Sequence, residues 1–308
     1  MANLPIKEGE VAFDAPNAGK PCKTWYKIVG DLDSSSSSSP PLITLHGGPG
    51  AGHEYLTSLI DLYSAHGIPL IFYDQVGCGR STHFQEKMGD DSFWTFDLFY
   101  KELDNLIDHL NLRTKGFYIL GQSWGGVLGG AYASRRPSPQ GLLKLIIASG
   151  PASIPLYVKG CQQLLSQLPP DKRRHESPEF EAAAAVFYAR HVCRLDPYPD
   201  EVQMAFKNLK EDPTSYLTIQ GPSEFVIIGN IKDWEGWPDA HNIQAETLLL
   251  NGRYDEVTDL CVEPWFKTIP KVKWVTLESS SHMAHWEARE RYMQVCASFL
   301  SSSYPEGK

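Results

Sequence analysis

The hexapeptide at residues 121–126, Gly-Gln-Ser-Trp-Gly-Gly, constrains the fold of this chain more than any other feature of the sequence. It directly follows the apolar run Phe117–Leu120, which has the length and composition of a buried strand. Glycines on both sides of Ser123 let a helix begin at once and pack closely against that strand. We therefore predict a sharp strand-to-helix turn that exposes the serine hydroxyl at its tip.

Similar apolar runs recur along the chain, with helical stretches between them. The runs are Leu42–Leu45, Leu70–Tyr73, Leu145–Ala148, Thr247–Leu250 and Val272–Leu277, and the helical stretches lie at about 92–111, 124–135, 259–268 and 287–301. Continuous apolar runs are typical of parallel strands buried on both faces. Two earlier segments, Glu10–Phe13 and Thr24–Val29, alternate in polarity and predict antiparallel edge strands. This order predicts the α/β class, with a mostly parallel central sheet and helices on both faces.

Residues 151–238 interrupt the alternation, because they are rich in proline and in helical stretches such as Glu179–His191. We interpret them as a helical cap inserted into a core made of residues 1–150 and 239–308. A separate domain on a linker is the alternative, but core-like strands resume at Thr247, which favours an insertion. The six consecutive serines Ser34–Ser39 predict a flexible surface loop.

The composition narrows the expected partners and location. A net charge of −9 argues against nucleic acid or an anionic membrane as a partner. No apolar run is long enough for a membrane span, and residues 1–10 lack the basic and apolar regions of a secretory signal. The six cysteines are scattered without a C-x-x-C pair, as expected for reduced thiols. We expect a cytoplasmic monomer without metal or cofactor.

Ser123 needs a base and an orienting acid before its hydroxyl can act as a nucleophile. The strand Thr247–Leu250 is followed by Asp255, and the strand Val272–Leu277 is followed by His282. Because the carboxyl ends of parallel strands meet at one edge of a sheet, we expect both side chains to lie near the serine. The order serine, acid, histidine is also the one that accompanies this type of serine turn. We predict a nucleophile, an orienting acid and a general base in that order.

Each of these assignments has a plainer alternative. Ser123 could be a helix N-cap, a common role for serine at such a turn. Glu256, rather than its neighbour, could be the orienting acid. His285 and His46 compete with the predicted base, since one is close in sequence and the other follows an early strand. The flanking glycines and the positions at strand ends favour the first set.

An oxyanion hole is the other requirement of acyl transfer. One donor should be the backbone N–H of Trp124, the residue after the nucleophile. The loop at residues 46–50 reads His-Gly-Gly-Pro-Gly, and we assign the second donor to Gly48 because glycine allows the close approach that is needed. A phosphate-binding loop is the alternative, but neither of the glycine-rich phosphate motifs is present.

A set of longer motifs is spread along the chain, at residues 46–50, 74–81, 121–126, 221–225, 231–234, 254–257 and 281–282. Together they resemble the proline iminopeptidase (prolyl aminopeptidase) family of α/β-hydrolases. The resemblance covers nearly the whole chain, and it is closest to the tricorn-interacting aminopeptidases of archaea, with related amino-acid amidases next. It implies the α/β-hydrolase fold and maps the catalytic triad to Ser123, Asp255 and His282.

The resemblance also implies an activity, the release of an N-terminal residue, often proline, from short peptides through an acyl-enzyme. It further implies that Glu224 in the cap and Glu256 beside the triad bind the free α-ammonium of the substrate. Two carboxylates in a partly desolvated pocket would attract one cation and reject a blocked N-terminus. A salt bridge within the cap is the plainer role for Glu224, and a solvated loop acid is the plainer role for Glu256.

Other substrates fit the same triad. An amino-acid amidase is one alternative, and an esterase or lactonase of specialised metabolism is another. A binding protein or receptor that has lost turnover is a third, which the complete set of catalytic residues disfavours. The expected partner is thus a small peptide or amino-acid amide with a free amine.

Four more side chains are expected near the site. Tyr216, Phe225 and Trp234 could form walls of the substrate pocket, although packing is the plainer role of each. Cys78 follows the strand Leu70–Tyr73, and a bulky thiol reagent at this cysteine is expected to inhibit by obstruction.

Overall fold

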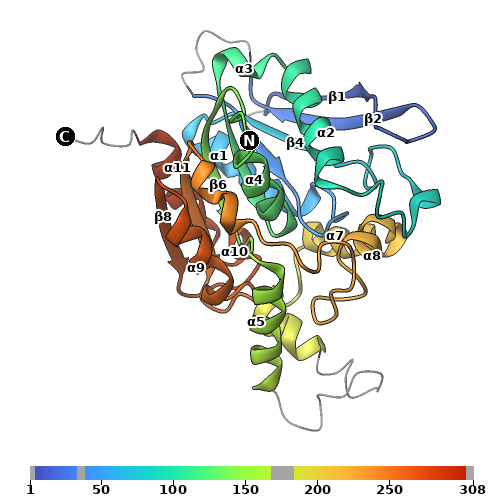
Figure 1. The fold of residues 1–308 in the computed structure, drawn as a ribbon. Helices are drawn as coiled ribbons and strands as arrows, with labels where there is room; N and C mark the ends of the chain where they lie inside the picture. Colours follow the sequence, from blue (N-terminus) through green and yellow to red (C-terminus); the bar gives the residue numbers. More distant parts are fainter. Residues whose placement is uncertain (1–3, 33–38, 168–183, 303–308) are drawn as a thin grey trace.

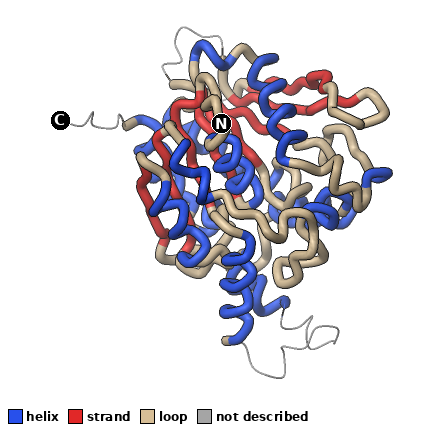
Figure 2. The backbone as a smooth tube through the Cα atoms, in the orientation of Figure 1, coloured by secondary structure: helices blue, strands red, loops and turns tan. Residues whose placement is uncertain are grey.

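The computed structural model describes residues 4–32, 39–167 and 184–302 (Figure 1). A sheet with the strand order β1-β2-β4-β3-β5-β6-β7-β8 runs through its centre, and helices lie around it (Figure 2). The strands are β1 (Ile6–Phe13), β2 (Cys22–Val29), β3 (Leu42–Leu45), β4 (Leu70–Tyr73), β5 (Phe117–Gln122), β6 (Leu142–Ala148), β7 (Glu246–Gly252) and β8 (Val272–Leu277). Every predicted strand is present, and several are longer than their apolar runs because sheet pairing continues into the flanking residues.

The strand directions create a crevice at one edge of the sheet. β1, β2 and β4 pair antiparallel, whereas β4, β3, β5, β6, β7 and β8 are parallel along the sheet. From β3 the chain crosses to β4 on one side and then returns to β5 on the other. The loops after β3 and β5 therefore diverge at the carboxyl edge, which is where ligands bind in sheets of this kind.

Helices pack in pairs around the sheet. The described α-helices are α1 (Ile60–His66), α2 (Phe96–His109), α3 (Leu112–Lys115), α4 (Trp124–Ala133), α5 (Ile154–Ser166), α7 (Asp200–Glu211), α8 (Thr214–Ile219), α9 (Asp259–Thr268), α10 (Ala284–Glu287) and α11 (Arg289–Ser301). α1 packs on α11, while α2 packs on α4. Each helix of the described ranges is too short or too polar to span a membrane.

The helix expected at about 92–111 begins later than predicted. Its first residue is Phe96, because Thr95 caps the helix by accepting a hydrogen bond from the backbone N–H of Leu98. The preceding residues form a turn instead, in which the Asp90 carboxylate accepts hydrogen bonds from the backbone N–H groups of Ser92 and Phe93.

Several helices connect β6 to β7 in the described part of the chain. They are α5, the π-helical turn η4 (Tyr188–Val192), α7, α8 and the 3-10 helix η5 (Trp237–Asn242). Figure 1 shows α5 at the bottom of the molecule and α7 and α8 next to each other on its right side. The helix predicted at Glu179–His191 lies partly outside the described residues, as does most of the serine run. α7 is fastened to the core by Asn208, whose side-chain amide donates to the carbonyl oxygen of Ala51 and to the carboxylate Oε2 of Glu54.

The other 3-10 helices are η1 (Glu54–Leu59) and η2 (Gln85–Lys87). η1 follows the loop after β3 and contacts α7. The loop that carries the predicted oxyanion donor is therefore in contact with the segment between β6 and β7.

The turn between β5 and α4 leaves no room for larger residues at its glycines. A Cβ on Gly121 would lie 1.9 Å from the carbonyl oxygen of Gly125, and a Cβ on Gly125 would lie 2.0 Å from that of Leu45. Ser123 itself has a φ of 58° and a ψ of −123°, a strained conformation for a residue with a side chain. The glycine pattern thus reflects three backbone segments in direct contact.

We predict that Gly125→Ala destabilises the fold by roughly 3 kcal/mol or more, because two backbones must separate to admit the methyl group. Gly129→Ala in the same helix is the control, since its Cβ would meet neighbouring side chains at 3.4 Å, an ordinary contact. Alanine favours helix over glycine, so this control should stay within about 1 kcal/mol of wild type. Thermal denaturation compares the two, and equal melting temperatures would contradict the packing argument.

Candidate active site

A cavity at the carboxyl edge of the sheet brings together the residues singled out from the sequence. It is lined by Gly48, Ser123, Trp124, Glu224, Glu256 and His282, among others. Ser123 lies between β5 and α4, and its backbone N–H donates to the carbonyl oxygen of Ala148 at 2.9 Å. This bond anchors the turn to the end of β6 and fixes the serine at the cavity wall.

Asp255 and His282 form a buried pair beside the serine. The Nδ1–H of His282 donates to Oδ1 of Asp255 at 2.8 Å, and the same oxygen accepts the backbone N–H of Val257 at 2.9 Å. Burial alone would lower the pKa of His282, but the carboxylates of Asp255 and Glu256 outweigh it and raise that pKa to about 9. The bond at Nδ1 leaves Nε2 as the ring nitrogen available to the cavity.

The two rival histidines are engaged elsewhere. Nε2 of His46 accepts the backbone N–H of Gln75 at 3.0 Å, and burial lowers the pKa of His46 to about 4. His285 donates from Nε2 to the carbonyl oxygen of Tyr55 at 3.1 Å, and burial lowers its pKa to about 3. Both are neutral core histidines that hold the loops around the site.

The two residues predicted to donate to an oxyanion, Gly48 and Trp124, both line the cavity. The N–H of the preceding residue, Gly47, is already bonded to the Tyr55 hydroxyl at 2.6 Å. Gly48 has a φ of 103°, which a residue with a side chain rarely adopts. Trp124 is the first residue of α4, where backbone N–H groups have no partner within the helix.

Two glutamines that the sequence argument did not single out connect these parts. Gln75 donates to the carbonyl oxygen of His46 at 3.1 Å and accepts the indole N–H of Trp124 at 2.9 Å. Gln122 accepts the Tyr55 hydroxyl at 2.6 Å and donates to the carbonyl oxygen of His282 at 3.1 Å. Gln75 lies in the motif at 74–81 and Gln122 in the motif at 121–126, and this position was the one sign in the sequence that they belong to the site. They tie the two amide-bearing segments and the histidine loop into one unit.

Glu224 enters the cavity from the loop after α8. Its two oxygens accept hydrogen bonds from the hydroxyls of Tyr188 and, at 3.0 Å, Tyr216. Gln220 in turn donates to the Tyr216 hydroxyl at 3.0 Å. Within the described part of the chain these partners are uncharged, so the arrangement differs from the salt bridge considered above.

Glu256 lies deeper, with 4% of its surface exposed. Its Oε1 is 3.7 Å from Nε2 of His282, and its Oε2 has no hydrogen-bond partner among the described residues. Burial raises the pKa of Glu256 above its ordinary value, with the charges of Glu224 and Asp255 acting in the same direction, while the charge of His282 opposes this rise. Asp255 therefore occupies the orienting position at Nδ1, and Glu256 is a buried acid of the cavity rather than a solvated loop residue.

Comparison with known proteins places the chain in a family. Residues 40–289 match the model of the alpha/beta hydrolase fold. The chain is 40% identical over 291 residues to the proline iminopeptidase of Saccharolobus solfataricus, covering 91% of this chain and 89% of the relative. It is 33% identical over 289 residues to that of Thermoplasma volcanium, covering 91% and 93%. The chain belongs to the proline iminopeptidase family of α/β hydrolases.

Solved structures agree with this membership. The crystal structure of VinJ superposes with a TM-score of 0.87 at 39% identity, covering 96% of this chain and 98% of VinJ. The proline iminopeptidase of Mycobacterium smegmatis superposes with a TM-score of 0.85 at 35% identity, covering 95% and 97%. The family and the α/β-hydrolase fold predicted from the sequence are confirmed.

The aromatic walls of this proline iminopeptidase family member differ from those predicted. Tyr216 lines the cavity, together with Tyr157, Tyr188 and Phe206. Phe225 and Trp234 are not among the described lining residues. Phe225 packs on Phe187 with ring centroids 4.7 Å apart, and Trp234 packs on Phe96 with centroids 5.4 Å apart. Phe187 in turn contacts Tyr188, and Phe96 stacks on Trp124, so Phe225 and Trp234 pack behind residues that line the cavity. The direction of the loop after α8, which decides this, cannot be read from the sequence.

Cys78 also lies outside the cavity lining. Its Sγ is 3.3 Å from the carbonyl oxygen of Gln75 and 3.4 Å from Nε2 of His46, and 1% of the residue is exposed. Burial raises the pKa of this thiol well above its ordinary value. The predicted obstruction by a thiol reagent is therefore not supported by the position of the side chain.

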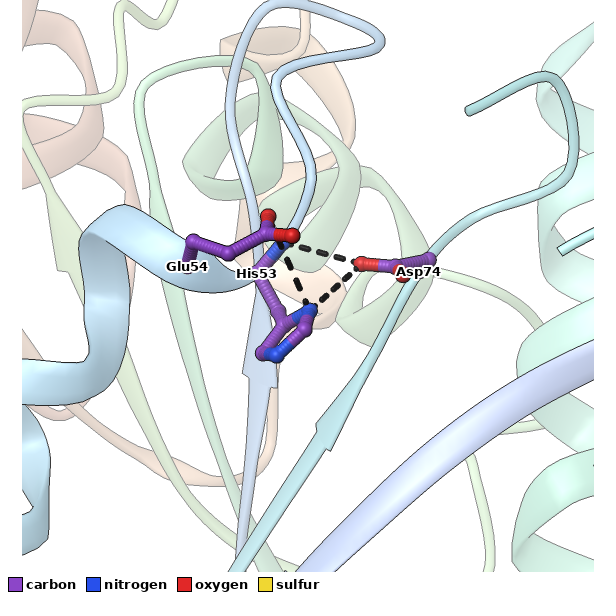
Figure 3. Close-up of side chains that lie close together, drawn as sticks. All are labelled: His53, Glu54 and Asp74. Carbon is purple, nitrogen blue, oxygen red and sulfur yellow. Dashed lines mark hydrogen bonds and ion pairs between the residues drawn. The ribbon is translucent and has the colours of Figure 1, made fainter. Parts of the chain in front are cut away.

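A second cluster contains the buried His53 and Asp74 and the half-buried Glu54, which lie within reach of one metal ion (Figure 3). Nδ1 of His53 is 2.8 Å from Asp74 Oδ1 and 3.8 Å from Glu54 Oε2. Asp74 also accepts the backbone N–H groups of His53 and Arg80, and the Lys27 ammonium lies 3.3 Å from Nε2 of His53. Because these polar atoms are paired and a lysine is adjacent, we assign the cluster to structure and not to metal binding.

We predict that native protein protects Cys78 from iodoacetamide. Its reaction should be at least roughly tenfold slower than in the guanidinium-unfolded chain, because the thiolate is scarce and covered. Peptide mapping by mass spectrometry measures the rate, with the more exposed Cys22 as the internal comparison. Equal labelling rates of Cys78 in the native and unfolded chains would contradict its placement.

Proposed function

We propose that this chain is a serine aminopeptidase that releases an N-terminal residue, proline above all, from short peptides. The observation that carries the proposal is the position of two acids, Glu224 and Glu256, in the same cavity as Ser123 and His282. Its relatives from Saccharolobus solfataricus and Mycobacterium smegmatis are proline iminopeptidases, which supports the same conclusion.

In the proposed mechanism, Ser123 Oγ attacks the carbonyl carbon of the first peptide bond while His282 Nε2 accepts the hydroxyl proton. Asp255 holds the imidazole in the required tautomer through Nδ1. The backbone N–H groups of Gly48 and Trp124 stabilise the developing oxyanion. His282 then donates its proton to the leaving amine, and a water molecule, activated by the same histidine, releases the acyl group.

The two acids select the substrate in this proposal. Glu224 and Glu256 bind the free α-ammonium, and the distance from that ammonium to the carbonyl sets which peptide bond reaches Ser123. A substrate with a blocked N-terminus would offer these two carboxylates no ammonium while still covering them from water, which is costly. An amino-acid amide satisfies the same contacts, so amidase activity is the second candidate. A neutral ester or lactone is disfavoured because it offers no cation.

We also propose that residues 151–238 act as a cap over the core formed by residues 1–150 and 239–308. The support is that Glu224, Tyr188 and Tyr216 come from this segment and complete the cavity. A cytoplasmic location and a monomeric state stay predictions from composition.

We predict that Ser123→Ala abolishes turnover of prolyl 4-nitroanilide by at least about 10⁴-fold while the melting temperature stays within a few degrees, because the nucleophile is lost without a packing change. A fluorophosphonate probe should label wild type and fail to label the variant. Asp255→Asn should lose activity similarly through the wrong histidine tautomer. Wild-type turnover in Ser123→Ala would reject the mechanism, and an unlabelled wild type would favour a binding protein.

We predict that Glu224→Gln raises KM for prolyl 4-nitroanilide at least roughly tenfold, since a buried ion pair with the substrate is lost. The variant should leave hydrolysis of the 4-nitrophenyl ester of cyclopentanecarboxylic acid, which has the proline ring without its nitrogen, nearly unchanged. Glu211→Gln is the control, because Glu211 lies on α7 and pairs with exposed Lys207. A similar change for both substrates would contradict the ammonium site.

A further inference from the structure

His282 lines the same cavity as Ser123 and Glu256. Asp255 engages Nδ1, so Nε2 is the nitrogen left to take a proton from Ser123. The carboxylate of Glu256 also approaches this nitrogen, with Oε1 at 3.7 Å. Both side chains of this pair are nearly fully buried, so water screens their attraction weakly. A protonated ring can therefore be held by Glu256 instead of serving the serine.

Glu256 and Glu224 differ in how their charges are satisfied. Glu224 has a hydroxyl donor on each oxygen. Glu256 also interacts with a hydroxyl, that of Tyr157, but its Oε2 has no hydrogen-bond partner among the described residues, and its closest charged partner there is the imidazole of His282. A buried carboxylate in this position requires a cation, and before substrate arrives the imidazolium is that cation.

We propose that Glu256 is an exchangeable counter-ion that makes His282 a competent base only when a substrate ammonium is bound. In the free enzyme Glu256 pairs with the imidazolium, which cannot accept a proton from Ser123. The substrate ammonium then takes over Glu256, and the Nε2 proton leaves to solvent water. One positive charge enters the pocket and one departs as a proton, so the pocket charge is conserved. The inference rests on the proposed function and extends it, because amine recognition controls the base as well as affinity.

The surroundings of the pair favour the protonated ring. The carboxyls of Asp255 and Glu224 face it, and each acts to raise the pKa of His282. The remaining ionisable groups around the pair are the hydroxyls of Tyr55, Tyr157, Tyr188 and Tyr216, the thiols of Cys161 and Cys261, the imidazoles of His191 and His285, and the carboxyl of Glu287 beyond Ser281. Burial raises the pKa of these hydroxyls and thiols and lowers that of both imidazoles, so they are neutral near pH 7. Within the described residues, the ring is therefore surrounded by negative or neutral groups.

The proposal predicts an effect on the pH dependence that simple ammonium binding does not. An opposite charge within this distance shifts a pKa by about 1–3 units, so pairing the carboxylate with another cation should lower the pKa of the base by at least about one unit. Activity requires the neutral ring and is lost as pH falls through that pKa. The acid limb of acylation should thus lie at lower pH when the bound substrate carries an ammonium.

The test measures the acylation burst by stopped flow with 4-nitrophenyl esters of proline and of cyclopentanecarboxylic acid. In wild type at saturation, the acid limb for the prolyl ester should lie at least about one pH unit below that for the carbocyclic ester. In Glu256→Gln the acid limb for the carbocyclic ester should move to lower pH by a similar amount. The acid limbs for the two esters should then coincide. Glu224→Gln is the matched control, because it weakens ammonium binding without the close contact to Nε2.

Coincident limbs in wild type would overturn the proposal, and this comparison needs no variant to fold. An unmoved carbocyclic limb in a folded Glu256→Gln protein would overturn it as well, as would an equal shift in Glu224→Gln. Failure of the proposed function looks different. In that case prolyl 4-nitroanilide is not cleaved, but both esters still acylate Ser123. The acid limbs of their pH profiles can then still be measured.

Discussion

The structure depends on the direct backbone contact between the start of α4 and the end of β3. Gly125 lies against the carbonyl oxygen of Leu45, and Gly121 lies against Gly125, at distances that exclude any Cβ. This contact forces Ser123 into its strained conformation and brings the loop after β3 next to the serine. One packing constraint therefore places both Ser123 and the loop that carries Gly48, and the energy of the surrounding sheet offsets the strain.

Hydrogen bonds then convert this contact into a rigid site. Gln75 joins the loop after β3 to Trp124, and Gln122 joins the serine turn to Tyr55 and to the loop of His282. These bonds are buried, so breaking one leaves polar groups without water to replace the partner. Catalysis by preorganised dipoles requires such fixed positions, since the amides must already point at the oxyanion.

The electrostatics of the cavity are dominated by acids around a single histidine. Asp255 and Glu256 approach opposite nitrogens of His282, whereas Glu224 accepts hydrogen bonds from two tyrosine hydroxyls. An excess of negative charge in a desolvated pocket is unfavourable unless a cation is supplied. A substrate with a free amine supplies it, which links the chemistry of the site to the kind of molecule that it accepts.

The sequence by itself determined the α/β class, the strands of the sheet and the turn at Ser123, because apolar periodicity and glycine spacing are local properties. It also placed Asp255 and His282 at strand ends, since parallel strands share a carboxyl edge. The start of α2, the positions of Phe225, Trp234 and Cys78, and the roles of Gln75 and Gln122 were decided only by the tertiary structure. Capping competition, loop direction and hydrogen bonds between distant segments set these features. The 3.7 Å approach of Glu256 to His282 is of the same kind, because it depends on how two loops pack in three dimensions.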